Sequence, residues 1–217
     1  MKLLAMDGAL GAFSAACVSD GRVFAQRCAG NDALEAGLAR VAEVLSAAGL
    51  SVGELERIAV GIGPGSFTGV RIALSFAKSL AYAAGIPIVG ISSYDVLTPD
   101  DAQPPVLTAV HGRAGVVCAR LRGPGGDTVA CGPTAVVIRR LIGDTQAVPV
   151  LAGDTAEVLA ALGPARAARA VVLAAPAEVP AVRIAALALQ RLPAASVHAI
   201  APDYGEVPAV RAPKGRN

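Results

Sequence analysis

The chain has 217 residues, 54% of them hydrophobic and 17% charged, which is enough apolar material for the core of one large or two small globular domains. A net charge of +2, only 3% aromatic residues and no tryptophan argue against direct, independent RNA binding. An acidic residue follows the N-terminal apolar run too early for a signal peptide, and no later stretch is long and apolar enough to span a bilayer. We therefore expect a soluble, cytoplasmic protein with no membrane partner.

The four cysteines show no Cys-x-x-Cys pair and no histidine at ligand spacing, so we expect reduced, mostly buried thiols and no metal site. These cysteines are Cys17, Cys28, Cys118 and Cys131. The histidines, His111 and His198, are far apart and form no paired-histidine helix motif. This spacing excludes a metalloprotease.

The first hundred residues predict three antiparallel strands followed by alternating helices and parallel strands. The antiparallel strands are expected at Leu3–Met6, Ala12–Val18 and Arg22–Cys28, with a hairpin turn at Asp20-Gly21. Further along, we expect a strand at Arg57–Ile62, a helix at Ser66–Ala84 and a strand at Pro87–Ile91. This is the element order of a ribonuclease-H-like lobe.

The first helix is expected between the third and fourth of these strands. It begins at Asp32, which forms a capping box with Glu35, and it ends at Gly49. Its apolar face, predicted to cover the sheet, consists of Leu34, Leu38, Val41 and Leu45.

A glycine-rich turn at residues 61–69 joins a strand to a helix and brings peptide N–H groups to a surface. Spacing excludes a P-loop, a dinucleotide fingerprint and a nucleophile elbow, because the required Lys and the required glycines are missing. We interpret Ser66 as a helix cap rather than a nucleophile, and the helix N-terminus is left open as an anion site. The structural turn and cap residues are Gly61, Gly63, Pro64, Gly65, Ser66 and Gly69.

The turn and its continuation closely resemble the signature of the TsaB (YeaZ) family. The matching residues are Gly61–Ala83 and Ile86–Ser93. The resemblance implies an α/β protein with the actin-like ATPase fold, in which two ribonuclease-H-like lobes each carry a mixed sheet flanked by helices. It also implies a non-catalytic scaffold subunit that binds and supports TsaD. TsaD transfers threonylcarbamoyl to N6 of the anticodon-adjacent adenosine in tRNAs that read ANN codons.

The resemblance extends to further partners and to cofactors. It implies that TsaE joins the complex, that tRNA is reached only through the complex, and that the isolated chain forms a homodimer. It implies no cofactor bound by the chain alone, with ATP or ADP and magnesium only in complex with TsaD and TsaE. A protease activity toward TsaD, also associated with the family, finds no nucleophile or metal set in this chain.

A polar, proline-containing stretch at Thr98–Pro105 predicts a domain boundary. We expect a first lobe at residues 1–102 and a reduced second lobe at 103–217, whose last residues are candidates to return to the first lobe. The elements expected in this half are strands at Val106–Val110, Val116–Leu121 and Val148–Ala152, a turn at Gly123–Asp127, and helices at Thr155–Leu162 and Ala181–Leu192.

Asp7 and Gly8 end the first strand, where actin-like kinases and ATPases carry an acid followed by glycine. Gly153 is a partial match to the nucleotide-binding loops of the second lobe. These three residues form a candidate vestigial nucleotide site, and the alternative function is a stand-alone actin-like ATPase or small-molecule kinase. The family's Ser or Thr after the acid is replaced here, which weakens the case for autonomous phosphate binding. A two-metal nuclease would use Asp7 and Glu35 as ligands, but the strand at Arg57–Ile62 ends without an acid, and a lone pair of carboxylates on different elements is more often structural. We therefore expect no catalytic residue.

The helix at Ser66–Ala84 is apolar around most of its circumference, so something besides the sheet is expected to cover it. The resemblance identifies TsaD as the partner on this helix and the first one. The predicted partner-binding residues are Ala33, Gly37, Arg40, Val44, Arg71, Ser75, Lys78 and Tyr82. We expect a bulky charged residue at Gly37 or Ser75 to abolish TsaD binding while the monomer stays folded.

Overall fold

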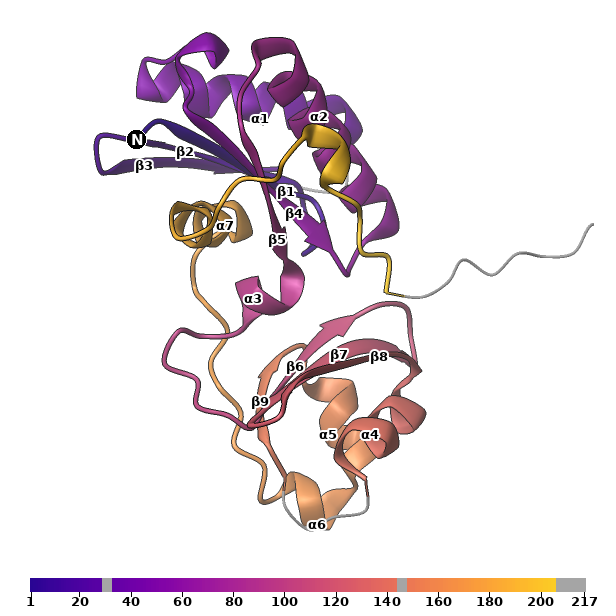
Figure 1. Cartoon of the computed structure of the whole chain (residues 1–217). Coiled ribbons are helices and arrows are strands. Elements are labelled where there is room, and N and C mark those ends of the chain that lie inside the picture. The colour runs from indigo at the N-terminus through magenta and orange to yellow at the C-terminus, as the bar shows by residue number, and fades with distance from the viewer. Residues whose placement is uncertain (29–32, 144–147, 206–217) are drawn as a thin grey trace, which may run out of the picture.

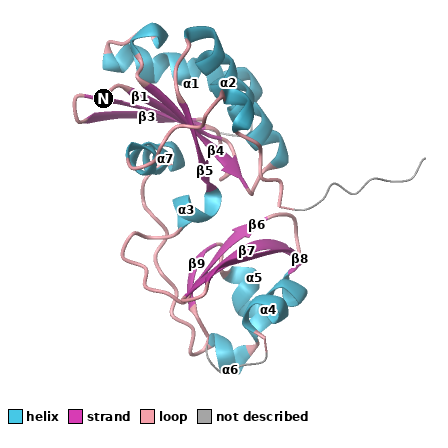
Figure 2. Cartoon of the chain, viewed as in Figure 1, coloured by secondary structure: helices cyan, strands magenta, loops and turns pink. Residues whose placement is uncertain are grey.

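The computed structural model describes residues 1–28, 33–143 and 148–205. These residues form a five-stranded sheet and a four-stranded sheet, each flanked by helices (Figures 1 and 2). The first sheet contains β1 (Leu3–Asp7), β2 (Ser14–Ser19), β3 (Arg22–Arg27), β4 (Arg57–Gly63) and β5 (Ile88–Ser92). The second contains β6 (Val106–His111), β7 (Val116–Gly123), β8 (Gly126–Pro133) and β9 (Val150–Gly153).

The helices connect and cover these sheets. They are α1 (Ala33–Ala48), α2 (Phe67–Ala84), α3 (Ser93–Leu97), α4 (Thr134–Ile142), α5 (Ala156–Leu162), α6 (Pro164–Ala167) and α7 (Pro180–Leu189), with 3-10 turns η1 (Val52–Glu54) and η2 (Val197–Ala199). We call the first sheet with α1, α2 and α7 the first lobe, and the second sheet with α4, α5 and α6 the second lobe. None of the helices in the described ranges is long and apolar enough to cross a membrane.

Both sheets follow the same pattern of strand pairing. In the first, with strand order β3-β2-β1-β4-β5, the hairpin strands pair antiparallel, and β4 pairs parallel with β1 and β5. In the second, with order β8-β7-β6-β9, two antiparallel pairs are followed by the parallel pair of β6 and β9. This arrangement confirms the expected fold class of two mixed sheets flanked by helices.

The first sheet is covered on both faces. Helices α1 and α2 lie on one face and α7 on the other (Figure 1). Helix α2 begins after Ser66, whose hydroxyl accepts a hydrogen bond from the Gly69 N–H at 3.2 Å, and it ends at Gly85, which has a left-handed φ of 66°. The predicted cap and stop of this helix are therefore confirmed.

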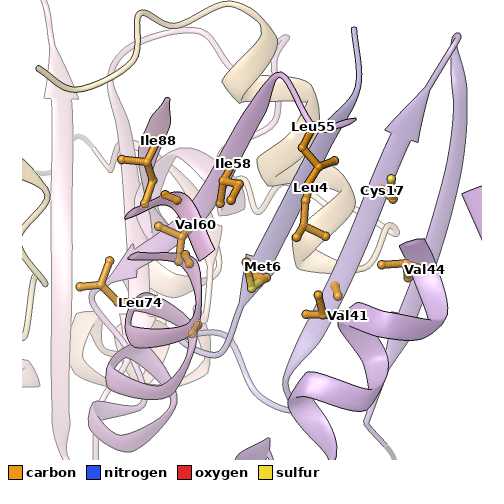
Figure 3. Packing of buried hydrophobic residues seen from close by; sticks show 14 of the residues in the cluster. Leu4, Met6, Cys17, Val41, Val44, Leu55, Ile58, Val60, Leu74 and Ile88 are labelled. Carbon is orange, nitrogen blue, oxygen red and sulfur yellow. The ribbon is translucent and has the colours of Figure 1, made fainter. Parts of the chain in front are cut away.

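The apolar face predicted for helix α1 is confirmed at Val41 and Leu45, which are buried, but not at Leu38. Val41 and Val44 point from α1 toward the first sheet, with Val44 nearest Cys17 (Figure 3), and Val44 is fully buried, whereas Leu38 is 51% exposed. The physical reason is Gly37, which packs against the rings of Phe13 and Phe76 and so turns the 37–41–44 stripe inward. The predicted position of Leu38 in the core is wrong, and the predicted cap at Asp32 with Glu35 lies outside the described residues.

The chain returns to the first lobe after the second lobe is complete. Ile184, Ala185 and Ala188 of α7 pack against Leu3 and other residues of the first sheet. The segment that follows continues along the same lobe, because the Ala194 N–H donates to the carbonyl of Ile88 at 2.9 Å. The first lobe is therefore built from two separate parts of the chain.

The second lobe contains three elements that were not predicted: β8, α4 and the short α6. Strand β8 is an exposed edge strand with glycines and a proline, which masks its pattern. Helix α4 follows Pro133 directly and buries Val137, Ile138, Leu141 and Ile142, a spacing that is visible in the sequence once its start is known.

The expectation of four thiols is wrong. Cys118 on β7 lies directly opposite Cys131 on β8, and the structure joins them in a disulfide. The pairing depends on the register of two strands, one of which was not predicted. Cys17 and Cys28 are buried, as expected.

Candidate functional site

The glycine-rich turn between β4 and α2 packs against protein backbone. The Ser66 N–H donates to the carbonyl of Ala9 at 2.9 Å, and a Cβ on Gly65 would overlap that same carbonyl. A Cβ on Gly63 would overlap the carbonyl oxygen of Asp203. Because glycine has no Cβ, these positions let neighbouring segments of the chain approach closely. The space beside the glycines is filled by this backbone rather than by a bound molecule.

The first turn of α2 also packs against protein backbone. Gly69 and Gly8 approach so closely that a Cβ on either would overlap the carbonyl of the other. The N–H groups of Ser66, Gly69 and Val70 all donate within the chain. The anion site left open at this helix N-terminus therefore lacks these three donors.

Asp7 is fully buried beneath this turn. Its Oδ2 accepts a hydrogen bond from the Leu10 N–H at 2.9 Å, while its Oδ1 is buried with no hydrogen-bond partner, and a Cβ on Gly61 would overlap it. Burial raises the pKa of Asp7 to about 6, although N–H groups of the loop and the charge of Arg27 oppose the shift. The carboxyl is inaccessible to solvent, so this candidate residue of a vestigial nucleotide site is a buried group in the structure.

This shift predicts how stability depends on pH. Because the folded protein holds the Asp7 proton to about pH 6 and an ordinary Asp loses it near 3.8, stability should fall as the pH rises between these values. The fall corresponds to roughly 3 kcal/mol, at about 1.4 kcal/mol for each pKa unit. Urea unfolding of the wild type and Asp7→Asn should show a difference in unfolding free energy that changes by this amount from pH 4 to 7.

Asp100→Asn is the control for this titration. Its hydrogen bonds with Arg183 hold the pKa of Asp100 below the ordinary value, so its contribution to stability is lost only as the pH falls. The difference between wild type and this control should therefore be flat from pH 5 to 7. A pH-independent difference for Asp7→Asn would contradict the burial of a titrating carboxyl.

A cleft of about 890 Å³ lies between the two lobes. Its lining comes from the glycine-rich turn, the β6–β7 turn, the disulfide and the end of the described chain. Asp7, Gly8 and Gly153 are not among its lining residues. The structure therefore does not bring the three candidate nucleotide-site residues together around this cleft.

On the second-lobe side, acidic side chains hold the β6–β7 turn. The His111 N–H donates to Asp154 at 2.8 Å, and the Gly115 N–H donates to Glu157 at 3.1 Å. The bond from Gly115 lowers the pKa of Glu157, and the Thr134 hydroxyl adds to the effect. The N–H of His111, which lines the cleft, is thus occupied by a carboxylate, and this disfavours a phosphate there. Gly153 is needed because a Cβ would overlap the carbonyl of Ala109.

Helix α2 presents a polar strip with apolar flanks to the outside. Arg71, Ser75 and Tyr82 are exposed and Lys78 is half-buried, as the helical wheel predicted. A shallow groove of about 280 Å³ lies along this strip. It is lined by Thr68, Arg71, Ile72, Ser75 and Phe76. An apolar groove with flanking polar groups is suited to a protein partner.

Phe67, at the start of α2, is an exposed residue that the sequence reasoning assigned no role. Its side chain is 50% exposed and stacks on Tyr204, with ring centroids 4.7 Å apart. The guanidinium of Arg71 lies 5.3 Å from the Phe67 ring. An aromatic residue directly after the predicted cap was the available signal for this contact. Its partner, Tyr204, comes from a distant part of the chain and could not be predicted from the local sequence.

Two of the four partner-binding residues predicted on α1 lie in the core. Gly37 and Val44 are buried against the first lobe's own core and cannot contact a partner. Arg40 is half-buried and pairs with Glu43 at 2.8 Å. Ala33 lies in α1, but its side chain is outside the described residues. The exposed Leu38 replaces the buried positions as the apolar residue that α1 offers.

Within the described part of the chain, no three His, Cys, Asp or Glu side chains gather as a potential metal site. Two places in the structure therefore remain as candidate functional sites: the exposed surface of α2 and the cleft between the lobes. Neither holds a nucleophile paired with a base in the described contacts.

Comparison with known proteins gives the family. A family model described as TsaD, tRNA N6-adenosine threonylcarbamoyltransferase, matches residues 30–195. The tRNA threonylcarbamoyladenosine biosynthesis protein TsaB of Escherichia coli (strain K12) is 34% identical over 122 residues, covering 54% of this chain and 53% of that protein. The protein of the same name from Haemophilus influenzae is 41% identical over 56 residues, or 26% and 24% of the two chains.

A solved structure agrees with these relatives. YeaZ from Pseudomonas aeruginosa superposes with a TM-score of 0.69 at 25% identity, covering 94% of this chain and 99% of that one. The chain spans about half the length, or less, of the two TsaB relatives that it matches. The chain therefore belongs to the family that the model describes, and within it to the TsaB (YeaZ) proteins.

Proposed function

We propose that the chain is a non-catalytic scaffold subunit in the biosynthesis of threonylcarbamoyladenosine in tRNA, and that it binds TsaD through α2. The observation that carries the proposal is the outward face of α2, where a groove with apolar sides runs beside Arg71 and Ser75. The family membership and the names of the TsaB relatives, which are tRNA threonylcarbamoyladenosine biosynthesis proteins, support the pathway.

The close packing of the glycine-rich turn supports a role without catalysis. The backbone of Gly8 and Ala9 occupies the space against the glycine-rich turn, and Asp7 is buried below it. Nucleotide chemistry in the complex is then a property of TsaD and TsaE. The rival function, a stand-alone ATPase or kinase, predicts hydrolysis of ATP by the purified chain with magnesium. We expect hydrolysis only after TsaD and TsaE are added.

Ser75→Arg tests the proposed surface. Ser75 is exposed in the groove, so a large charged side chain should block a partner without entering the core. We expect the affinity for TsaD to fall at least about tenfold, equivalent to roughly 1.4 kcal/mol, with the thermal midpoint unchanged. Titration calorimetry or surface capture of TsaD measures the first, and thermal unfolding the second.

The matched control is Thr128→Arg, which places the same side chain on exposed β8 of the second lobe. It should bind TsaD like the wild type. Gly37 is not a usable test position, because a charged residue there would disrupt the contact with Phe13 and Phe76. Equal TsaD affinity of Ser75→Arg and Thr128→Arg would reject the α2 surface. If the isolated chain forms a homodimer through the same face, Ser75→Arg should also be monomeric in sedimentation.

A further inference from the structure

A pair of sulfur atoms lies in the wall of the cleft between the lobes. Cys118 and Cys131 form a disulfide across the β7–β8 pair, and both residues line the cleft. Cys131 is half-buried, whereas Cys118 is only 5% exposed. A small thiol that enters the cleft therefore meets Cys131 first.

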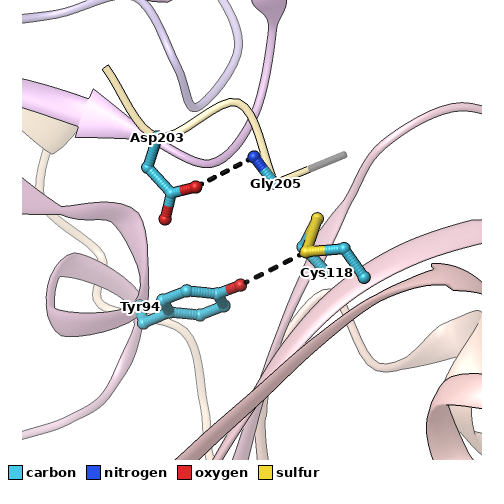
Figure 4. Close-up of a disulfide and its surroundings, with 5 residues drawn as sticks. Tyr94, Cys118, Asp203 and Gly205 are labelled. Atoms are coloured by element: carbon cyan, nitrogen blue, oxygen red, sulfur yellow. Dashed lines mark hydrogen bonds between the residues drawn. A yellow bond between two sulfur atoms is a disulfide. The ribbon is translucent and has the colours of Figure 1, made fainter. Parts of the chain in front are cut away.

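Two segments from outside the second lobe close on this pair (Figure 4). The hydroxyl of Tyr94, on α3, lies 3.9 Å from Cys131 Sγ. Gly205 lies on the opposite side, where a Cβ would overlap Cys118 Sγ and come within 3.0 Å of Cys131 Sγ. Glycine is required here also because φ is +69°. The sulfur pair is thus in direct contact with the end of the described chain.

Reduction of the pair requires space that this contact does not offer. Bonded sulfurs lie about 2.05 Å apart, whereas non-bonded heavy atoms keep a separation of about 3.5–4 Å. When the bond opens, the half-buried Cys131 sulfur has room toward the cleft, whereas the sulfur of Cys118, a residue only 5% exposed, lies directly against Gly205. Tyr94 is 3% exposed and fixed in a helix, whereas Gly205 is held through an Asp203 side chain that accepts its N–H at 2.9 Å. The segment Asp203–Gly205 is therefore the one that moves.

That segment is connected to the exposed face of α2. The ring of Tyr204 packs against the ring of Phe67, the first residue of α2, and the guanidinium of Arg71 lies over the Phe67 ring. The Asp203 N–H donates to the carbonyl of Ile62, near the start of the glycine-rich turn, at 2.7 Å. A shift of Gly205 would therefore be transmitted to the stacking partner of Phe67 and to the position of Arg71.

We propose that Cys118 and Cys131 are a reversible dithiol–disulfide site whose state controls how Asp203–Gly205 packs against the first turn of α2. The reductant is a small monothiol. Its thiolate attacks Cys131 Sγ, the S–S bond breaks, and the electron pair leaves on Cys118 Sγ, which takes up a proton. The thiolate of a second monothiol then attacks the sulfur of the first, the electron pair leaves on Cys131 Sγ, which takes up a proton, and the two monothiols leave together as the small-molecule disulfide. Two monothiols are thus oxidised as the protein disulfide is reduced. Only the effect on TsaD binding rests on the proposed function.

The test equilibrates the full chain in mixtures of glutathione and glutathione disulfide, followed by acid quenching, alkylation in denaturant and mass measurement. We expect a change from two to four alkylated cysteines as the mixture becomes more reducing. Amide hydrogen exchange in the two states should be at least about fivefold faster at residues 67–71 and 203–205 after reduction. The double variant Cys118→Ser/Cys131→Ser should exchange at the faster rate in both mixtures, and Cys17→Ala should respond like the wild type.

The outcomes separate the two proposals. A count fixed at two or at four across all mixtures overturns the reversible site. Exchange at 203–205 that is equal in both states overturns the coupling to α2, even if the cysteines titrate. If both responses are observed but neither state binds TsaD, the proposed function fails and the dithiol–disulfide site remains. If both states bind TsaD equally, the transmission to the partner surface is rejected.

Discussion

Replacement of Gly69 by alanine is expected to lower the free energy of unfolding by about 3 kcal/mol or more. Gly69 lies in the first turn of α2, where alanine by itself would favour the helix by about 1 kcal/mol. The added Cβ, however, would overlap the carbonyl oxygen of Gly8, and it would lie 3.1 Å from Ser66 Oγ. Both contacts involve anchored groups that cannot yield without lifting α2 from the end of β1.

Chemical denaturation measures this effect, and Gly53→Ala is its control. Gly53 lies in η1, and a Cβ there would have nothing within 4 Å, so the change should be within about 0.5 kcal/mol. Gly8→Ala approaches the same contact from the other side and should be comparably destabilising. A Gly69→Ala protein as stable as the wild type would show that these backbones are not in direct contact in solution.

Asp95→Ala is the second substitution with a large expected effect, a loss of roughly 3–5 kcal/mol, because it leaves a buried charge unpaired. The Asp95 carboxylate accepts from Arg120 at 2.7 Å, from Arg122 at 3.3 Å and from Arg191 at 2.7 Å. Arg120 is 8% exposed and lies over the ring of Tyr94, 5.2 Å from its centroid. Without Asp95, this guanidinium keeps only a longer pairing with Asp127 at 3.6 Å.

Asp127→Ala is the matched control, because it removes a carboxylate from the same cluster at its exposed rim. Both Asp127 and its partner Arg122 are about 40% exposed, so the loss should be at most about 1 kcal/mol. Denaturation of both variants at pH 7 distinguishes the two positions. Equal losses would contradict the assignment of Asp95 as the centre of the cluster.

The effect of Asp95→Ala should also depend on pH. Burial raises the pKa of Asp95, but the charges and hydrogen bonds of Arg120 and Arg191 outweigh it and hold the pKa below the ordinary value of 3.8. The stabilisation is therefore complete above this value and is lost as the pH falls below it. The gap between wild type and variant should narrow only at strongly acidic pH.

Much of the first lobe could be predicted because its signals are local. The Asp-Gly hairpin, the Ser66 cap and the Gly85 stop each act over a few residues, and the structure has all three elements where they were expected. The outward strip of α2 also followed from helical periodicity. Where a single helix packs on a single sheet, the spacing of apolar and polar residues along the helix is sufficient to predict which face is exposed.

The remainder depends on contacts between distant parts of the chain. The orientation of α1 is set by Gly37 against Phe13 and Phe76, a contact that no helical wheel contains. The disulfide requires the β7–β8 register, and the cover on Phe67 comes from Tyr204. A polar residue at a known motif position, such as Asp7, can be located in the sequence. Whether its side chain is buried depends on the segments that pack over it.

The return of α7 to the first sheet has a consequence for how the chain must fold. The face of β1 and β4 that α7 covers includes Leu3, Ala5 and Ala59, all without solvent exposure in the complete fold. A fragment that stops near residue 102 would leave this apolar face open to water and to other fragments. On the ribosome, the lobe that is made first is therefore finished last, and a premature stop in the second lobe would release a first lobe that is prone to aggregate.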